Sequence, residues 1–315
     1  MFALRGFAVS LSVFVIVYCA LSFAVSMTWR NVREWAKHYP ARRIADLLFA
    51  LRLFPLAAAL VITAAFTIPS FLLLEPRAVD EPLGTAPLVL GLCGMGVILA
   101  GLFNVIGAVR RASKTISTWT RQAEPIRAQA PLPVLRIPLA IPPMTAVGIV
   151  RPRILVSSAA ESVLAEKELR TAMSHEMAHV RRRDNLRKLF LRFVAFPGMN
   201  GLESAWLEET EMAADDAAVT NASEALDLAA ALIKLSRLPS EAPADLTAAL
   251  VRSPASIMNA RVERLLAWTD RRVASSDKLS VLCSVSAALG TIALAAITYS
   301  HLLVRIHTAT EWFVR

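Results

Sequence analysis

The chain has 315 residues, of which 56% are hydrophobic, a net charge of +9 and a mean hydropathy of +0.51. This composition is too apolar for an ordinary soluble protein. The basic excess does not indicate direct nucleic-acid binding, because the sequence has neither zinc-finger spacing nor interleaved aromatic and basic residues, whereas positive groups that flank membrane segments explain it.

Three uncharged runs early in the chain are long enough to cross a bilayer: 7–27, 53–74 and 87–109. A fourth, 279–299, lies near the other end of the sequence. Within the third run, Gly94 and Gly101 are seven residues apart and share one helix face, which favours close helix packing. The sequence therefore predicts an integral membrane protein, mainly α, with four transmembrane helices.

Loop charges predict the orientation. The segment between the second and third runs is mostly acidic, whereas basic residues follow the first run and the third: Arg30, Arg33, Lys37, Arg42 and Arg43, then Arg110, Arg111, Lys114, Arg121 and Arg127. By the positive-inside rule, the N-terminus lies outside the cell (inner) membrane. We predict three transmembrane helices in 1–109, a cytoplasmic domain in 110–278, and a fourth helix with a short outside tail in 279–315.

The start of the cytoplasmic domain has two predicted elements. Residues 113–130 are typical of a helix that leads away from the membrane, and the Pro-rich, β-branched segment 132–156 predicts short strands with turns. Such a strand either binds substrate backbone as an added strand or is a structural hairpin that covers the next helix. Ser158 and Glu161 fit a capping box at the start of the following helix or of a short helix just before it.

The next helix carries the motif His175-Glu176-Met177-Ala178-His179. Residues four apart share a helix face, so His175 and His179 can both bind one tetrahedral metal ion. Glu176 lies about 100° round the helix, from where it can act as a general base on a metal-bound water. The pattern HExxH predicts the core of a zinc metalloprotease.

A third ligand is needed, and carboxylates are the available pool, because the other histidines lie in or beside apolar runs. The segment 208–216 reads as a second helix. On it Glu211 and Asp215 share a face, so Glu211 can bind zinc while Asp215 orients a ligand histidine. Glu208, on the same face, is the alternative ligand. Between the two motifs, 189–206 reads as a membrane-adjacent helix and loop.

The chain resembles the BlaR/MecR-type membrane zinc metallopeptidases. The resemblance rests on HEMAH, on Arg181-Arg182-Arg183-Asp184-Asn185, on Glu211-x-x-Ala-Asp215-Asp216, on the segment 147–156, and on 253–266 with its Arg261-Val262-x-Arg264-Leu265-Leu266. It implies a zincin-like α+β metallopeptidase domain inserted between transmembrane helices 3 and 4. It also implies His175, His179 and Glu211 as ligands of one Zn²⁺ per chain, with Glu176 as the base.

Two further residues take roles from this resemblance. Asp184 would orient a ligand histidine or simply cap the helix, and Arg261 would donate to the oxyanion or be a surface cation. The best-known family members carry a penicillin-binding sensor after the last membrane helix, and this chain stops at Arg315. The sensor function is therefore not carried over.

We expect a membrane-embedded zinc endopeptidase that cleaves a cytoplasmic or membrane-proximal protein, as in signal-dependent cleavage of a transcriptional repressor. Membrane lipid and a membrane partner acting as sensor are the other expected partners. The alternative is a non-enzymatic scaffold or signalling adaptor with a structural zinc site. A structural site, however, has no need of a general base such as Glu176 beside its first ligand.

Overall fold

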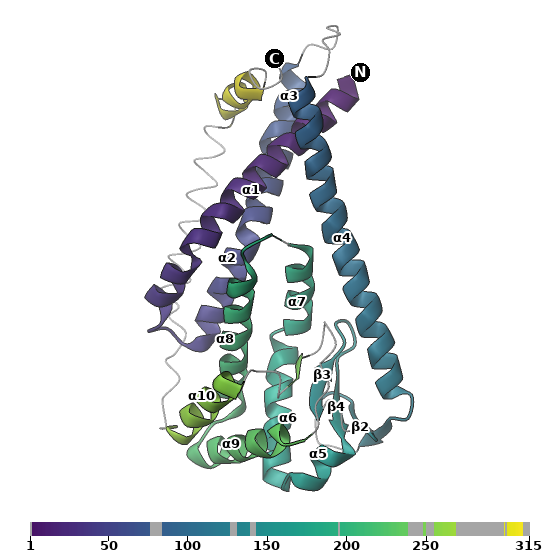
Figure 1. Ribbon diagram of the computed structural model, residues 1–315, viewed down its shortest axis with the longest axis vertical. Helices are drawn as coiled ribbons and strands as arrows, with labels where there is room; N and C mark the ends of the chain where they lie inside the picture. Colours follow the sequence, from purple (N-terminus) through teal and green to yellow (C-terminus); the bar gives the residue numbers. More distant parts are fainter. Residues whose placement is uncertain are drawn as a thin grey trace. The chain divides into compact units, whose positions relative to one another are not determined.

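The computed structural model describes residues 2–75, 84–126, 131–138, 143–194, 196–238, 248–249, 255–268, 299 and 301–310. The chain divides into two compact units, Met1–Val25 with Phe54–Ala100 and Arg272–Arg315, and Ser26–Leu53 with Gly101–Arg271. Figure 1 traces the elements of both units along the sequence. The fourth predicted span lies, apart from Tyr299, outside the described residues, and the predicted division at 109/110 and 278/279 stays a prediction.

Three helical segments are long and apolar enough to cross a membrane: α1 (Phe2–Ala36), the segment Ala41–Leu74 and α4 (Thr85–Thr120). The second consists of α2 (Ala41–Ile62), the π-helical η1 (Thr63–Thr67) and α3 (Ile68–Leu74). Each contains one predicted run, which confirms three of the four predicted spans as helices. At 34 to 36 residues they exceed the roughly 20 that a bilayer needs, so each continues beyond its apolar run.

In the first unit, α1 and α4 approach closely at glycines. A Cβ at Gly94 would lie 2.6 Å from the carbonyl oxygen of Leu11. Pro69 in α3 interrupts the helical hydrogen bonds, because it has no N–H to donate to the carbonyl four residues earlier. That carbonyl, of Ala65, instead accepts a hydrogen bond from the hydroxyl of Tyr299 at 2.6 Å.

The second unit contains a five-stranded sheet of order β1-β2-β4-β3-β5. Its strands are β1 (Glu124–Ile126), β2 (Val134–Ile137), β3 (Met144–Val147), β4 (Arg153–Ser157) and β5 (Ala248–Ala249). β2 and β4 are parallel, and the other pairs are antiparallel. β3 and β4 form the expected hairpin, whose turn requires Gly148 because φ is +90° there.

The edge of β3 bears on the predicted binding of substrate backbone, because this strand lies beside α6, the helix with the HExxH motif. Thr145 pairs with Ala249 and Ala146 with Ala248, so β5 occupies this edge at two residues. The edge that the sequence suggests for substrate backbone is thus already partnered there.

Among its described residues, the second unit also has six shorter helices: α5 (Ser158–Val163), α6 (Glu166–Arg181), α7 (Asp184–Phe193), α8 (Asn200–Ala218), α9 (Ala222–Ser236) and α10 (Ala255–Leu266). The expected capping box of Ser158 and Glu161 does not form: Ser157 caps α5 by accepting the N–H of Ala160 at 3.0 Å, and Glu161 instead accepts from Arg136. The expected helix 113–130 was also too long. α4 ends at Thr120, and β1 follows because Pro125 cannot continue a helix.

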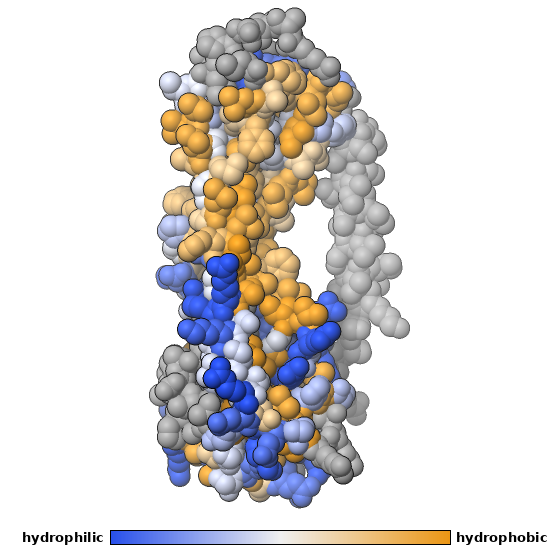
Figure 2. All heavy atoms as spheres, turned by 90° about the vertical axis from the view of Figure 1, so that its right-hand side faces the viewer, coloured by the Kyte–Doolittle hydropathy of each residue, from blue (hydrophilic) through white to orange (hydrophobic). Residues whose placement is uncertain are grey.

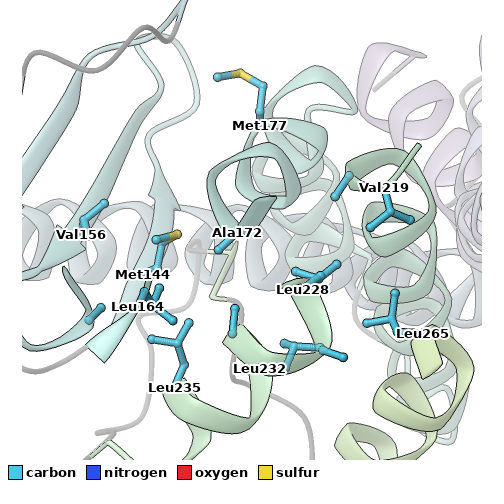
Figure 3. Packing of buried hydrophobic residues seen from close by; sticks show 14 of the residues in the cluster. Met144, Val156, Leu164, Ala172, Met177, Val219, Leu228, Leu232, Leu235 and Leu265 are labelled. Carbon is cyan, nitrogen blue, oxygen red and sulfur yellow. The ribbon is translucent and has the colours of Figure 1, made fainter. Parts of the chain in front are cut away.

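The core of the second unit lies around α6. Figure 3 shows Ala172 of α6 between the sheet residues Met144 and Val156 and a row of leucines from α9, Leu228, Leu232 and Leu235. Alanine at this position lets α9 approach α6 closely. The HExxH motif is therefore on a helix that is packed on several sides.

The ends of the long helices belong to this second unit. Trp119 of α4 packs with Ile137 and Leu155 of the sheet. A Cβ at Gly101 would lie 2.8 Å from the carbonyl oxygen of Phe193, so α4 and the end of α7 are also in close contact. The second unit therefore includes parts of three long helices and is not attached to them only by linkers.

Candidate metal centre

α6 places the two motif histidines on one buried face. His175 and His179 are 0% and 2% exposed, and their Nε2 atoms lie 3.1 Å apart. Glu211 reaches the same point from α8, with Oε2 3.5 Å from Nε2 of His175 and Oε1 3.6 Å from Nε2 of His179. The third donor that the sequence predicts therefore lies beside the first two.

The second ring nitrogen of each histidine faces a carboxylate. Nδ1 of His175 lies 2.9 Å from Oδ1 of Asp215, and Nδ1 of His179 lies 2.8 Å from Oδ2 of Asp184. A carboxylate accepts, so each Nδ1 carries the proton when the ring is neutral. The lone pairs of both Nε2 atoms then point to the same place as the Glu211 carboxylate.

This donor set fits a metal ion. Two lone pairs and a carboxylate that converge would repel one another unless a cation lies between them, and all three ligand atoms lie within 4.8 Å. Zn–N and Zn–O bonds of about 2.0–2.2 Å at a tetrahedral angle would hold the donors roughly 3.4 Å apart. The observed separations of 3.1, 3.5 and 3.6 Å lie close to that value.

Asp184 reaches His179 because of a tight turn after α6. Arg183 adopts the left-handed conformation, with φ 56° and ψ 40°, and α7 begins at the next residue. The turn buries Asp184 completely at the start of α7. Its neighbour Asn185 donates from Nδ2 to the carbonyl oxygens of Ala146 and Gly148 at 3.1 and 3.2 Å, which joins α7 to β3.

Glu176 is fully buried, and its two oxygens differ. Oε2 accepts the backbone N–H of Ala146 in β3 at 2.6 Å, whereas Oε1 accepts no hydrogen bond from the part of the chain that the structure describes. Burial raises the pKa of this carboxyl above its ordinary value, although His179 and His175 oppose the shift. One oxygen is thus held by the strand and the other is available to a water molecule.

Arg261 of α10 supplies the counter-charge for two of these carboxylates. It is 0% exposed, and its Nε and Nη2 each donate to Asp215 at 2.7 Å. Its Nη1 lies 3.1 Å from Oε2 of Glu211. The arginine is therefore not a surface cation, and it contacts the carboxylates of both Glu211 and Asp215. Its role as an oxyanion donor stays a prediction.

The charges of this network shift the acidities of its members. Burial alone would lower the pKa of His175, but Asp215 and Glu211 raise it to about 9. Burial alone would raise the pKa of Glu211, but the histidines and Arg261 lower it to about 2. Asp215 likewise has a pKa well below its usual range, mainly because of Arg261, which outweighs burial. Both carboxylates are ionised at neutral pH.

The alternative ligand Glu208 lies elsewhere. Its Oε2 is 2.7 Å from Nη2 of Arg33, and Oε1 of the adjacent Glu209 is 2.9 Å from the same nitrogen. Both carboxylates bind the end of α1, whereas the carboxylate of Glu211 lies beside Nε2 of both histidines. Sequence reasoning missed this ion pair and the role of Asn185. The only available signal for Asn185 was its place directly after Asp184.

The HExxH helix and the glutamate of a second helix thus bring together three donors that could hold a metal ion. Residues 139–265 match the family model described as BlaR1 peptidase M56. The match agrees with the family resemblance inferred from the motifs and extends over this segment of the chain. Among curated proteins, none matches the chain.

Proposed function

We propose that this protein is a membrane-embedded, zinc-dependent endopeptidase. The observation that supports this most strongly is the position of Glu176, one residue from a ligand histidine and fully buried. A site that served only to hold a metal ion would not need an acid with one oxygen left for water. His175, His179 and Glu211 would hold the zinc ion, which when bound supplies a Lewis acid that polarises a carbonyl and acidifies water.

The residues of the chain do the remaining chemistry. Glu176 takes the proton of the attacking water at Oε1 and passes it to the leaving amine. Its raised pKa suits this task, because the group must hold a proton briefly and then release it. The N–H of Ala146 fixes the other oxygen, so the carboxylate presents one oxygen to the water. Asp215 and Asp184 orient the histidines, and Arg261 positions Asp215 and Glu211.

The substrate follows from the predicted orientation. We propose that the peptidase domain faces the cytoplasm of a cell membrane, with its substrate a cytoplasmic protein such as a transcriptional repressor, and that a membrane partner supplies the signal. The support is the distribution of basic residues around the apolar runs. N-terminal peptide mapping of cells with the active protein should reveal new termini on cytoplasmic proteins. New termini only on outward-facing segments would contradict this orientation.

The test of the activity is Glu176→Gln, which keeps the size of the side chain but removes the base. We expect peptide cleavage by the detergent-purified protein to fall by roughly 10²–10⁴-fold while zinc content stays the same. Glu166→Gln is the matched control, because Glu166 lies exposed on the same helix. Unchanged cleavage in Glu176→Gln would refute the mechanism. Zinc binding without any cleavage by the wild type would favour the scaffold.

A further inference from the structure

The turn of the β3–β4 hairpin exposes an apolar side chain. Val150 at its tip is 88% exposed, the largest fraction among the large hydrophobic residues that the structure describes. The next residue, Arg151, is exposed as well. A single exposed valine is common on protein surfaces and has no significance by itself. What distinguishes this one is the element beside which the turn lies.

The hairpin lies along α4. Leu155 in the middle of β4 belongs to the same apolar cluster as Trp119, near the end of that helix. At the turn, Ile149 packs against the pair Ala108 and Ala112. From Trp119 back to the two alanines the helix rises by roughly 10–16 Å. The hairpin therefore points along α4 toward the apolar part of that helix, as Figure 1 also shows.

The two alanines lie at the level where the apolar surface of α4 ends. Phe103 and Val109 are exposed, and charged residues begin at Arg110. Figure 2, which faces this helix, shows orange surface giving way to blue along it. As a helix, the apolar run 87–109 is about 34 Å long, close to the roughly 30 Å of hydrocarbon in a bilayer. In a membrane, Val109 would thus mark the edge of the hydrocarbon, and the turn would lie among the lipid headgroups.

The end of α7 lies even farther along the apolar part of α4. A Cβ at Gly101 would be 2.8 Å from the carbonyl oxygen of Phe193, and Gly101 is about 12 Å along the helix from Val109. Phe190, one turn before Phe193, is half exposed. The hydrogen bonds of Asn185 join α7 to the hairpin. Two connected elements therefore lie against the same stretch of α4, and both expose apolar side chains there.

We propose that the turn of the β3–β4 hairpin inserts into the headgroup region of the bilayer that α4 crosses. Val150 contacts the outer ends of the acyl chains, and Arg151 contacts lipid phosphates. The partner is a lipid surface and not a second protein, because the turn packs on the helix that the lipid itself surrounds. The inference rests on the membrane insertion of α4, which is part of the proposed function, and not on the peptidase activity.

The contact holds the metal centre at a fixed distance from the lipid. Ala146, whose N–H binds Oε2 of Glu176 at 2.6 Å, is three residues from Ile149, which is at most about 10 Å of extended chain. The strand that holds Glu176 is thereby attached to the bilayer at its turn, in addition to the attachment that α4 provides.

The experiment places one fluorescent label at the turn of the full-length protein. The three native cysteines are first replaced by alanine: Cys19, Cys93 and Cys283. Val150→Cys is then labelled with the environment-sensitive dye NBD and reconstituted in nanodiscs of phosphatidylcholine and phosphatidylglycerol. Three quenchers are compared, namely a lipid with a nitroxide on its headgroup, a lipid with a nitroxide on its acyl chain, and aqueous iodide.

Two further labelled positions serve as references. Val163→Cys is the matched control, because this valine is also exposed but ends α5, which follows β4 at the end opposite to the turn. Phe103→Cys reports on the exposed apolar surface of α4. Zinc content and elution volume establish that each variant is folded, and Arg151→Cys takes the place of Val150→Cys if that variant is not.

We expect the headgroup nitroxide to remove most of the emission from Val150→Cys, and the acyl-chain nitroxide to remove most of it from Phe103→Cys. Iodide alone should quench Val163→Cys. Quenching of Val150→Cys by iodide alone would place the turn in water and overturn the proposal. Protection of this label from all three quenchers would indicate a protein partner and would overturn it as well.

The two references separate the remaining outcomes. Equal headgroup quenching of Val150→Cys and Val163→Cys would show that the turn has no contact of its own with lipid, which contradicts the proposal. Absence of acyl-chain quenching at Phe103→Cys would refute the membrane insertion of α4, and the proposal with it. Failure at Val150→Cys alone would leave the insertion of α4 intact.

Discussion

Two of the three ion pairs that the structure describes between α8 and α10 differ mainly in burial. Arg261 contacts Asp215 and Arg264 contacts Asp216, each at 2.7 Å. The first pair is 0% and 1% exposed, whereas the side chains of the second are 32% and 31% exposed. The buried pair faces the metal centre, and the other faces solvent.

The difference shows why similar contacts have different consequences. A buried charge has lost its hydration, so removing its partner leaves an uncompensated ion in a medium of low dielectric. An exposed charge recovers water when its partner is removed. Arg261 also has a second carboxylate, Glu211, 3.1 Å away, so two ionised acids depend on it. The buried pair is therefore part of the site, whereas the exposed pair is a minor contact between helices.

The largest effect is expected from Arg261→Met. This change leaves the buried Asp215 and Glu211 without their cation, and should destabilise the fold by about 3–5 kcal/mol. Arg264→Met should cost less than about 1 kcal/mol. Thermal unfolding of the two detergent-solubilised variants, with zinc content measured in parallel, checks this. Equal losses of stability would mean that burial does not distinguish the two pairs.

A smaller effect is expected when the acids are changed. Asp215→Asn should weaken zinc binding by about 10–100-fold, because the amide no longer orients His175 as a carboxylate does. Asp216→Asn should leave zinc affinity unchanged. Competition with a chelator of known affinity measures both. A loss of affinity in Asp216→Asn as large as in Asp215→Asn would contradict the assignment of Asp215 as the orienting residue.

The third prediction concerns pH. Without metal, His175 keeps its proton up to a pKa of about 9, and zinc requires the neutral ring. Zinc affinity should therefore rise as pH increases, by up to about tenfold per pH unit, and level off near pH 9. Asp215→Asn removes a cause of the raised pKa, so its plateau should begin at lower pH, whereas Asp216→Asn should follow the wild type. A flat profile between pH 6 and 8.5 would refute this.

The smallest effect is expected from salt. A double-mutant cycle on Arg264 and Asp216 should give a coupling of about 0.2–1 kcal/mol that declines at 1 M salt, where the screening length is about 3 Å. The coupling of Arg261 and Asp215 should change little, because solvent ions do not reach it. Unfolding midpoints at low and high salt provide the comparison. A salt-sensitive buried pair would indicate that water enters the site.

Much of the metal centre could be predicted because it depends on helical period. His175 and His179 share a face for the same reason that Glu211 and Asp215 do, since four residues make about one turn. The apolar runs in α1, in the segment Ala41–Leu74 and in α4 could also be predicted from the sequence, because bilayer thickness sets their length. Less could be said about where helices end: the predicted helix to residue 130 ends at Thr120.

The sequence by itself determined which residues can share a face and which segments are apolar enough to enter a membrane, because both follow from local geometry and composition. Only the tertiary structure decided that Arg261 lies against Asp215, 46 residues away, that the N–H of Ala146 holds Glu176, and that Arg33 binds Glu208, 175 residues away. These contacts depend on how α1, α10 and β3 pack around α6 and α8. Packing is a property of the whole core, and the period of one element does not encode it.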